Sequence, residues 1–313
     1  MLRLIALRIA MAVPVMLVVA TIVFLLLRLS PGDPALVIAG ETAGPEALAR
    51  IRTDMGLDRP LAVQYLAWLG EIARGHLGMS ILSKIPVLSL IFDRLEPTLV
   101  LAASAILITV LVAVPLGAIA AWRHNSWIDR AVMMLSVVGF SVPAFVIGYI
   151  LILLLAVKAD IFPVQGYVSP FEDPLAALRH LALPSLTLAL VFMALIARVT
   201  RSSLLEVLGE DFVRTARAKG NIERRVLWRH ALPNAAVPII TVIGLGIALL
   251  ISGVVVTESV FNIPGVGRLT IDAILARDYP VVQGLMLFFA LIYVGVNLLI
   301  DIAYVIVDPR IRY

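Results

Sequence analysis

The residues best suited to binding chemistry lie in one basic stretch, residues 198–234. Its core, 211–220, reads Asp-Phe-Val-Arg-Thr-Ala-Arg-Ala-Lys-Gly. Asp211 precedes Arg214 by about one helical turn, and Gly220 is a residue type that commonly ends a helix. The pattern therefore predicts a short helix that carries exposed charges and stops at the glycine.

This short helix has the composition of a docking element. Its small residues allow the backbone of a partner to come close, and its basic residues set the register of the contact. A second helical piece, 222–231, is expected to follow and to close on a Leu-Pro pair. An ordinary basic loop would explain the arginines but not the ordered spacing between glycine and proline. The residues expected to make the contact are Asp211, Arg214, Thr215, Ala216, Arg217, Ala218, Lys219, Gly220, Leu232 and Pro233.

Catalytic constellations are absent from the sequence. It contains no Cys, no Gly-x-x-x-x-Gly-Lys-Ser/Thr phosphate loop, no His-Glu-x-x-His metal motif and no Gly-x-Ser-x-Gly nucleophile elbow. The four histidines, His76, His124, His180 and His230, are scattered over loops and span ends. We therefore expect a protein that is not itself an enzyme and that requires no metal or other cofactor.

The elements that position the basic stretch belong in a lipid bilayer. Hydrophobic residues make up 61% of the 313 residues, charged residues only 15%, and the mean hydropathy is +1.04. Crossing a hydrocarbon core of about 30 Å takes about 20 apolar residues of helix. Six runs qualify, which predicts an all-α membrane protein with six transmembrane helices. These runs are Ile9–Leu27, Leu99–Trp122, Ala131–Val157, Leu181–Ala197, Ala235–Thr257 and Val281–Val307.

The distribution of charge orients these spans. Basic residues of the short loops gather on one side, which the positive-inside rule assigns to the cytoplasm, and an even number of spans puts both termini there. The loop 201–234 then lies in the cytoplasm between helices 4 and 5. The cytoplasmic loops also explain the pI near 9.6, so a nucleic-acid partner is not indicated.

The first apolar run is expected to be an uncleaved anchor, because no small-x-small cleavage site follows it. The insert after it contains two short amphipathic helices, 45–55 and 61–73, which either lie on the membrane surface or cap the bundle as a lid, the interpretation we favour. The glycines of the outer loop 258–280 indicate turn geometry or a re-entrant half-helix. The predicted parts are the N-terminal anchor helix (1–28), the extracytoplasmic insert (29–98), the transmembrane core (99–307) and a cytoplasmic tail (308–313).

Asp301 is the only ionisable residue inside a predicted hydrocarbon segment. A charge there costs about 2.5–3.5 kcal/mol on insertion scales unless it finds a partner or water. It lies near the depth at which Arg198 and Arg201 leave the fourth span, so we predict a structural ion pair with one of them in preference to a substrate or proton site. Four polar residues of the spans either line the substrate path or form hydrogen bonds between helices: Ser141, Ser252, Gln283 and Asn297.

The segment Arg214–Gly220 with Leu232-Pro233 resembles the EAA loop of permease subunits of bacterial ATP-binding-cassette importers, specifically the peptide/nickel family. The general Glu-Ala-Ala signature is loose here, since Arg214-Thr215-Ala216 replaces it and His230 replaces an Ile, whereas the peptide-family version fits well. His76 departs from the family pattern, in which Asp is expected. Further motifs look like the first of the two permeases in dipeptide, oligopeptide and glutathione systems: Pro31-Gly-Asp-Pro34, Gly56-Leu-Asp-Arg-Pro60, Arg198-x-x-Arg-Ser-Ser203, Pro264-Gly-Val-Gly-Arg268, Arg277-Asp-Tyr-Pro280 and Asp308-Pro-Arg310.

The resemblance implies a permease subunit of an ATP-driven importer for short peptides in the bacterial cytoplasmic (inner) membrane. The implied partners are a second homologous permease in a heterodimer, two cytoplasmic ATPases that dock on the coupling helix of the loop, and an extracytoplasmic substrate-binding protein. Nickel chelates or opines are alternative cargoes. An ion-coupled secondary transporter and a structural or assembly membrane protein remain as other classes; the former usually carries acidic residues near mid-membrane or inverted repeats, and Asp301 alone supports it poorly.

Overall fold

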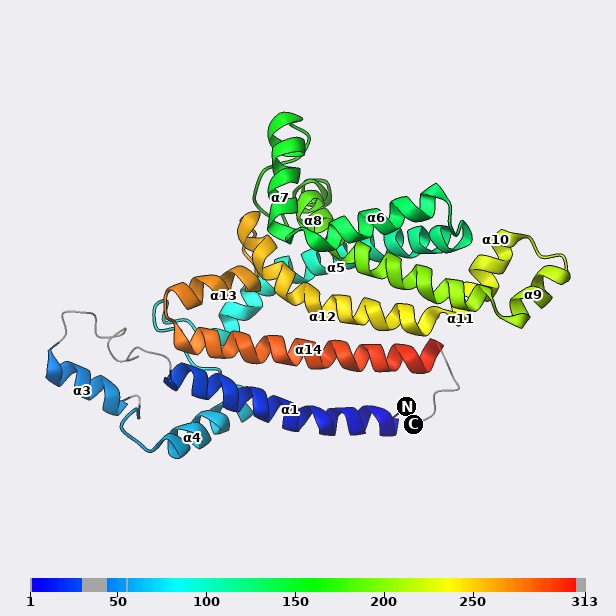
Figure 1. Ribbon diagram of the computed structural model, residues 1–313. Helices are drawn as coiled ribbons and strands as arrows, with labels where there is room; N and C mark the ends of the chain where they lie inside the picture. Colours follow the sequence, from blue (N-terminus) through cyan, green and yellow to red (C-terminus); the bar gives the residue numbers. More distant parts are fainter. Residues whose placement is uncertain (1, 30–43, 55, 308–313) are drawn as a thin grey trace. The chain divides into compact units, whose positions relative to one another are not determined.

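The computed structural model describes residues 2–29, 44–54 and 56–307 of the chain. Within those ranges the chain forms helices and turns and no β-strand, apart from one isolated bridge between Met79 and Pro86 (Figure 1). The predicted all-α class is therefore confirmed. The motifs at 31–34 and 308–310 and the predicted tail lie outside the described residues.

Three helices are long and apolar enough to cross a membrane: α5 (Val87–Trp122), α8 (Pro174–Leu208) and α14 (Tyr279–Val307). Helix α12 (Ala236–Val260) is apolar as well and bends by 66° from the helical segment before it. Counting each bent pair as one span gives up to five, and α1 (Leu2–Leu29) adds a shorter apolar stretch. The count of six spans stays a prediction.

The run 131–157, predicted as one span, is broken in the structure. It divides into α6 (Trp127–Ser141) and α7 (Ala144–Leu151), which continues as the π-helix η1 (Ile152–Lys158), with a bend of 104°. Val142 between them is extended, with φ −94° and ψ 125°, because Pro143 disfavours a helical conformation in the residue before it. The proline therefore breaks the helix, although the run 131–157 is apolar.

The chain forms two compact units. The first contains residues 1–95 and 268–294, and the second contains 96–267 and 295–313. In the first unit, helices α3 (Pro45–Asp54) and α4 (Leu61–Ala73) occupy the two segments predicted to be short helices. Helix α4 packs on α1, where the ring of Phe24 lies 5.3 Å from that of Tyr65.

Asp278 joins two distant parts of the first unit. It lies just before α14, is buried, and accepts hydrogen bonds from the hydroxyl of Ser80 and from the backbone N–H of Ile81 at 3.1 Å. Arg277 before it has a φ of 56°, which turns the chain sharply after α13 (Val266–Leu275). Two motifs 198 residues apart in sequence therefore meet at one carboxylate.

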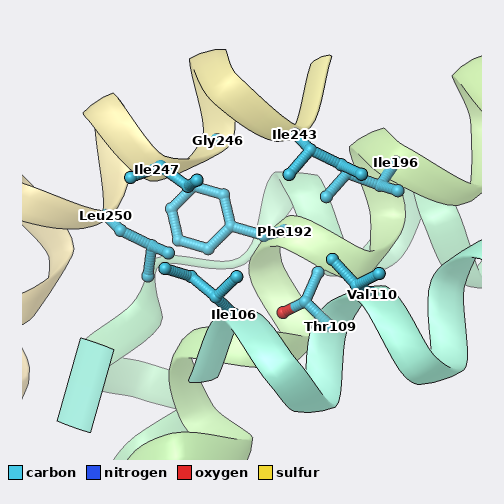
Figure 2. A pocket seen from close by; sticks show the side chains of 9 residues that line it. All are labelled: Ile106, Thr109, Val110, Phe192, Ile196, Ile243, Gly246, Ile247 and Leu250. Atoms are coloured by element: carbon cyan, nitrogen blue, oxygen red, sulfur yellow. The ribbon is translucent and has the colours of Figure 1, made fainter. Parts of the chain in front are cut away.

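The core of the second unit lies between α5, α8 and α12. Phe192, Ile243 and Leu250 close on one another there around a cavity of only about 10 Å³ (Figure 2). Helices α5 and α8 approach closely because Gly117 has no side chain: a Cβ at that position would lie 2.5 Å from the carbonyl oxygen of Ala197. The space between these three helices has room for one water molecule at most.

Glu258 is a fully buried carboxylate near the end of α12. Thr98 donates its hydroxyl to it at 2.6 Å and accepts the backbone N–H of Val266, the first residue of α13, at 2.8 Å. A Cβ on Gly265 would overlap this carboxylate, and one on Gly267 would lie 2.6 Å from Cα of Val255. These two glycines lie at the turn into the short helix α13 and leave room for close approach there, and neither has a positive φ.

Candidate coupling surface and substrate path

The basic stretch forms the helix that its sequence predicts. Helix α8 runs without a break to Leu208, and after two residues α9 (Asp211–Ala218) begins. Gly220 ends this segment with a φ of 80°, a conformation that favours glycine, and its N–H bonds to the carbonyl of Arg217 at 2.9 Å. The predicted helix stop at this residue is confirmed.

The underside of α9 is fixed to the rest of the second unit. Val213 and Ala216 are buried and pack with Val226, which follows the glycine turn. Val207 and Leu208, at the end of α8, complete this small apolar cluster. Helix α9, the segment after the glycine turn and the end of α8 therefore share one small apolar cluster.

The outer face of α9 is polar and open. Asp211 and Arg214 form an exposed ion pair of 3.2 Å, and Thr215 donates to the carbonyl of Asp211 at 3.0 Å. Arg217 reaches across the glycine turn to Glu223, with contacts of 2.8 and 3.3 Å. That arginine therefore braces the turn as well as carrying charge. Ala218, Lys219 and Gly220 are exposed.

The second helical piece runs from Glu223 to Asn234 and contains a π-helical turn, η2 (Val226–Ala231), between α10 (Glu223–Arg225) and α11 (Leu232–Asn234). It extends beyond the predicted 222–231 and ends at Asn234, one residue after Pro233. Pro233 is exposed and Leu232 is half-buried. Of the ten predicted contact residues, Ala216 and Leu232 thus face the protein core.

Three exposed large apolar residues of 211–234 were not among the expected contact residues: Phe212, Ile222 and Trp228. The side chain of Phe212 is 42% exposed and that of Ile222 is 70% exposed. The helical period could have predicted this for Phe212. Val213 and Ala216 are three residues apart and share one face of the helix, and Phe212 lies off that face. An aromatic and a β-branched residue beside a charged helix form the kind of apolar contact that protein interfaces use.

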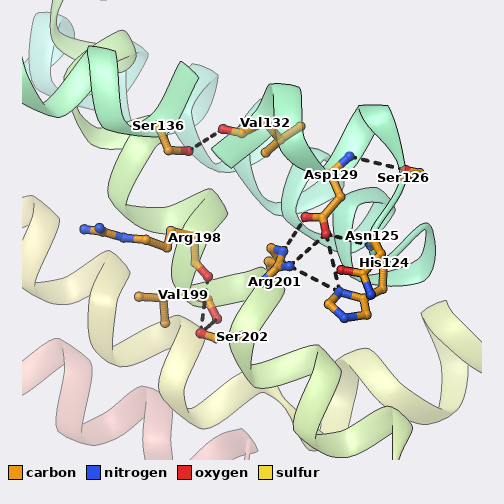
Figure 3. Close-up of polar contacts among 10 residues, drawn as sticks. All are labelled: His124, Asn125, Ser126, Asp129, Val132, Ser136, Arg198, Val199, Arg201 and Ser202. Atoms are coloured by element: carbon orange, nitrogen blue, oxygen red, sulfur yellow. Dashed lines mark hydrogen bonds and ion pairs between the residues drawn. The ribbon is translucent and has the colours of Figure 1, made fainter. Parts of the chain in front are cut away.

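Behind this surface, Asp129 and Arg201 join α6 to α8 (Figure 3). Arg201 donates Nε to one carboxylate oxygen and Nη2 to the other, the latter at 2.8 Å. The backbone N–H of Asn125 also donates to Asp129 at 3.0 Å, and His124 lies 3.4 Å away. Hydrogen bonding by Arg201 holds the pKa of Asp129 at about 2, although burial opposes this shift.

Comparison with known proteins identifies the family. Residues 113–313 match the family described as binding-protein-dependent transport system inner membrane component, and residues 1–102 match the N-terminal region of such membrane components. The chain belongs to this family. It is 49% identical, over 98% of each chain, to a probable peptide ABC transporter permease protein of Sinorhizobium fredii. It is 39% identical to the dipeptide transport system permease protein DppB of Escherichia coli K12, over 100% of this chain and 99% of that one.

Asp301 was predicted to form an ion pair with Arg198 or Arg201, and the structure gives the second of these arginines another partner. Arg201 makes its ion pair with Asp129, a partner that the sequence analysis did not consider. Arg198, one turn earlier on α8, is exposed and points away from Arg201 (Figure 3). Pairing of Asp301 with Arg198 stays a prediction.

The candidate path residues are distributed over both units. Ser141 is exposed and donates to the carbonyl of Val137 in its own helix at 2.8 Å. Gln283 is half-buried in the first unit and Asn297 is exposed in the second. The side chain of Ser252 lies outside the described part. Ser141, Gln283 and Asn297 are not among the residues that line the small cavity of Figure 2.

Proposed function

We propose that this membrane component is the first of two permease subunits of an ATP-driven importer for short peptides. The relatives named above are called peptide or dipeptide permeases, and they align over nearly the whole of this chain. Their names favour peptides over nickel chelates or opines as cargo. Substrate choice within that class is assigned to a separate extracytoplasmic binding protein.

We propose further that α9 is the coupling helix on which a cytoplasmic ATPase docks. The observation that carries this is the division of α9 into two faces: Val213 and Ala216 are buried against the end of α8, while the charged face is exposed. A partner that binds the exposed face can therefore act on α8 as a lever. Transport follows only if the ATPase binds α9 differently in its two nucleotide states, because equal affinity shifts no equilibrium.

The proposed topology has six spans, with both termini and α9 in the cytoplasm and the insert after α1 outside. The substrate path is placed between this subunit and a homologous partner. Support comes from the cavity between α5, α8 and α12, which at about 10 Å³ is far too small for a dipeptide; the pocket of about 460 Å³ in this unit lies elsewhere, between α5, α6, α7 and α8. A path at the subunit interface needs no opening of this core.

Co-purification tests the coupling helix. Ala218→Trp places a bulky ring on the exposed face of α9, and we expect the permease pair to lose its ATPases while its spans stay folded. Phe171→Trp, at an exposed site on the predicted outer side, serves as a control and should retain them. Full retention of the ATPases by Ala218→Trp would overturn the assignment of α9.

A further inference from the structure

Helix α4 has two apolar faces, and only one of them contacts α1. On that face Tyr65 and Trp68 are half-buried, with ring centroids 5.3 and 5.5 Å from the ring of Phe24. Tyr65 is also within hydrogen-bonding distance of Thr21, at 2.8 Å. This contact fixes the level at which α4 lies along α1.

The opposite face of α4 is exposed and equally apolar. Leu66 is 66% exposed and Val63 is 45% exposed, and Ala62, Ala67 and Ala73 lie on the same side at helical spacing. Residues 61–70 contain no charged side chain. A helix with apolar residues on two opposite faces, and with Gln64 and Glu71 as its only polar side chains, is expected to be surrounded largely by protein or by lipid.

The contact with α1 places α4 below the boundary of the hydrocarbon. The apolar run of α1 ends at Leu27, six residues after Thr21, which corresponds to about 9 Å at 1.5 Å per residue. Since Tyr65 meets Thr21 side by side, part of α4 lies at that depth. Val18 and Ile22 of α1 are themselves exposed, as expected of a span that faces lipid.

Charges at both ends of α4 set its orientation. Asp58 and Arg59 precede it, and Glu71 near its end bonds Arg74 at 2.8 Å and His76 at 3.1 Å. The 13 residues of the helix extend only about 20 Å, too short to cross the hydrocarbon core. Both polar ends can remain at the headgroups only if the helix lies along the membrane surface.

We propose that α4 is an interfacial helix whose outward face, with Val63 and Leu66 foremost, is covered by acyl chains of the outer leaflet. Tyr65 and Trp68 then lie on the opposite face of the helix, against Phe24 of α1. The insert after α1 is thereby anchored in the bilayer, in place of the lid that we favoured from the sequence. The inference rests on the proposed topology, in which this end of α1 is the outer one.

Because the chain contains no Cys, single cysteines can carry a spin label without background. Leu66→Cys and Val63→Cys are labelled in the complete transporter, reconstituted in vesicles of phosphatidylethanolamine and phosphatidylglycerol. Collision with oxygen, which partitions into lipid, is compared with collision with a water-soluble nickel chelate. Val18→Cys on α1 is the control for lipid, and Asp58→Cys is the control for water.

We expect both α4 labels to resemble Val18→Cys, with frequent oxygen collisions and few nickel collisions. Labels at Leu66→Cys that resemble Asp58→Cys would overturn the proposal, because the face would then be in water. Shielding from both reagents would also overturn it, since a protein partner would then cover the face. If Val18→Cys itself reports water, the assignment of α1 as a span fails, which is a separate result.

Discussion

The carboxylate of Asp129 accepts two hydrogen bonds from the guanidinium of Arg201, one on each oxygen, and thereby links the start of α6 to α8. Arg201 lies seven residues before the end of α8. Arg201 lies on the same continuous helix that leads to α9, so this pair sits between the proposed docking surface and the remaining spans. Planar, two-point pairing of this kind cannot be reproduced by lysine. A displacement of α8 at Arg201 should therefore move the start of α6 with it.

Breaking this pair should weaken both folding and coupling. Arg201→Gln leaves the buried Asp129 without its cation, and we expect a loss of about 3 kcal/mol in the free energy of unfolding. The measurements are thermal unfolding of the purified complex and the ratio of peptide transported to ATP hydrolysed. Ser202→Ala, an exposed neighbour on α8, is the matched control and should change neither. A normal transport ratio in a destabilised Arg201→Gln complex would limit the pair to a structural role.

The same pair should be insensitive to pH over the physiological range. Asp129 lies before the apolar run 131–157, and its pKa in the folded protein is about 2, below the ordinary value of about 3.9 for an aspartate. A lowered carboxyl pKa adds stability that is fully present above the ordinary pKa and is lost as the pH falls through the lowered one. The stability difference between wild type and Asp129→Asn should thus not fall between about pH 8 and 5 and should shrink between about pH 4 and 2. A difference that already shrinks at pH 6 would contradict this assignment.

The glycines that pack against Glu258 and Val255 should not tolerate a side chain. Gly267→Ala places a Cβ against the backbone of Val255, which cannot move aside cheaply, so we expect a loss of about 1–3 kcal/mol of stability. Gly295→Ala in α14, where a Cβ meets nothing within 4 Å, should be neutral or stabilise by up to about 1 kcal/mol. Thermal unfolding of the two variants side by side provides the check. Equal behaviour would show that α13 does not pack as described.

The sequence predicted the helices well because apolar length and helix-ending residues are local signals. Gly220 and the short helices 45–55 and 61–73 were found in this way. At Pro143 the sequence indicates a kink, whereas the structure has a full break with a bend of 104°, because a proline inside an apolar run does not distinguish the two. The partners of Arg201 and Glu258 were missed for another reason: Asp129 lies 72 residues away and Thr98 lies 160 away, and no local pattern reveals such contacts.

The predicted pair of Asp301 and Arg198 can be tested by a double-mutant cycle. Asp301→Asn and Arg198→Gln should each lower the thermal stability of the complex, and the double variant should lose less than the sum of both. We expect a coupling free energy of at least about 0.5 kcal/mol for a direct contact. Unchanged assembly and stability in Asp301→Asn with transport abolished would instead place this carboxylate in the substrate path.

Phe212 and Val213 are neighbours on α9 with opposite surroundings, and they should give opposite results. Phe212 is exposed, so Phe212→Ala should leave thermal stability unchanged but weaken ATPase binding about 10-fold or more, as expected for an aromatic interface residue. Val213 is buried under α9, so Val213→Ala should lower stability by about 1–2 kcal/mol through lost packing. Titration of ATPase subunits onto the reconstituted permease pair, with thermal unfolding in parallel, separates the two effects. If Phe212→Ala binds the ATPases normally, Phe212 is not part of the docking surface.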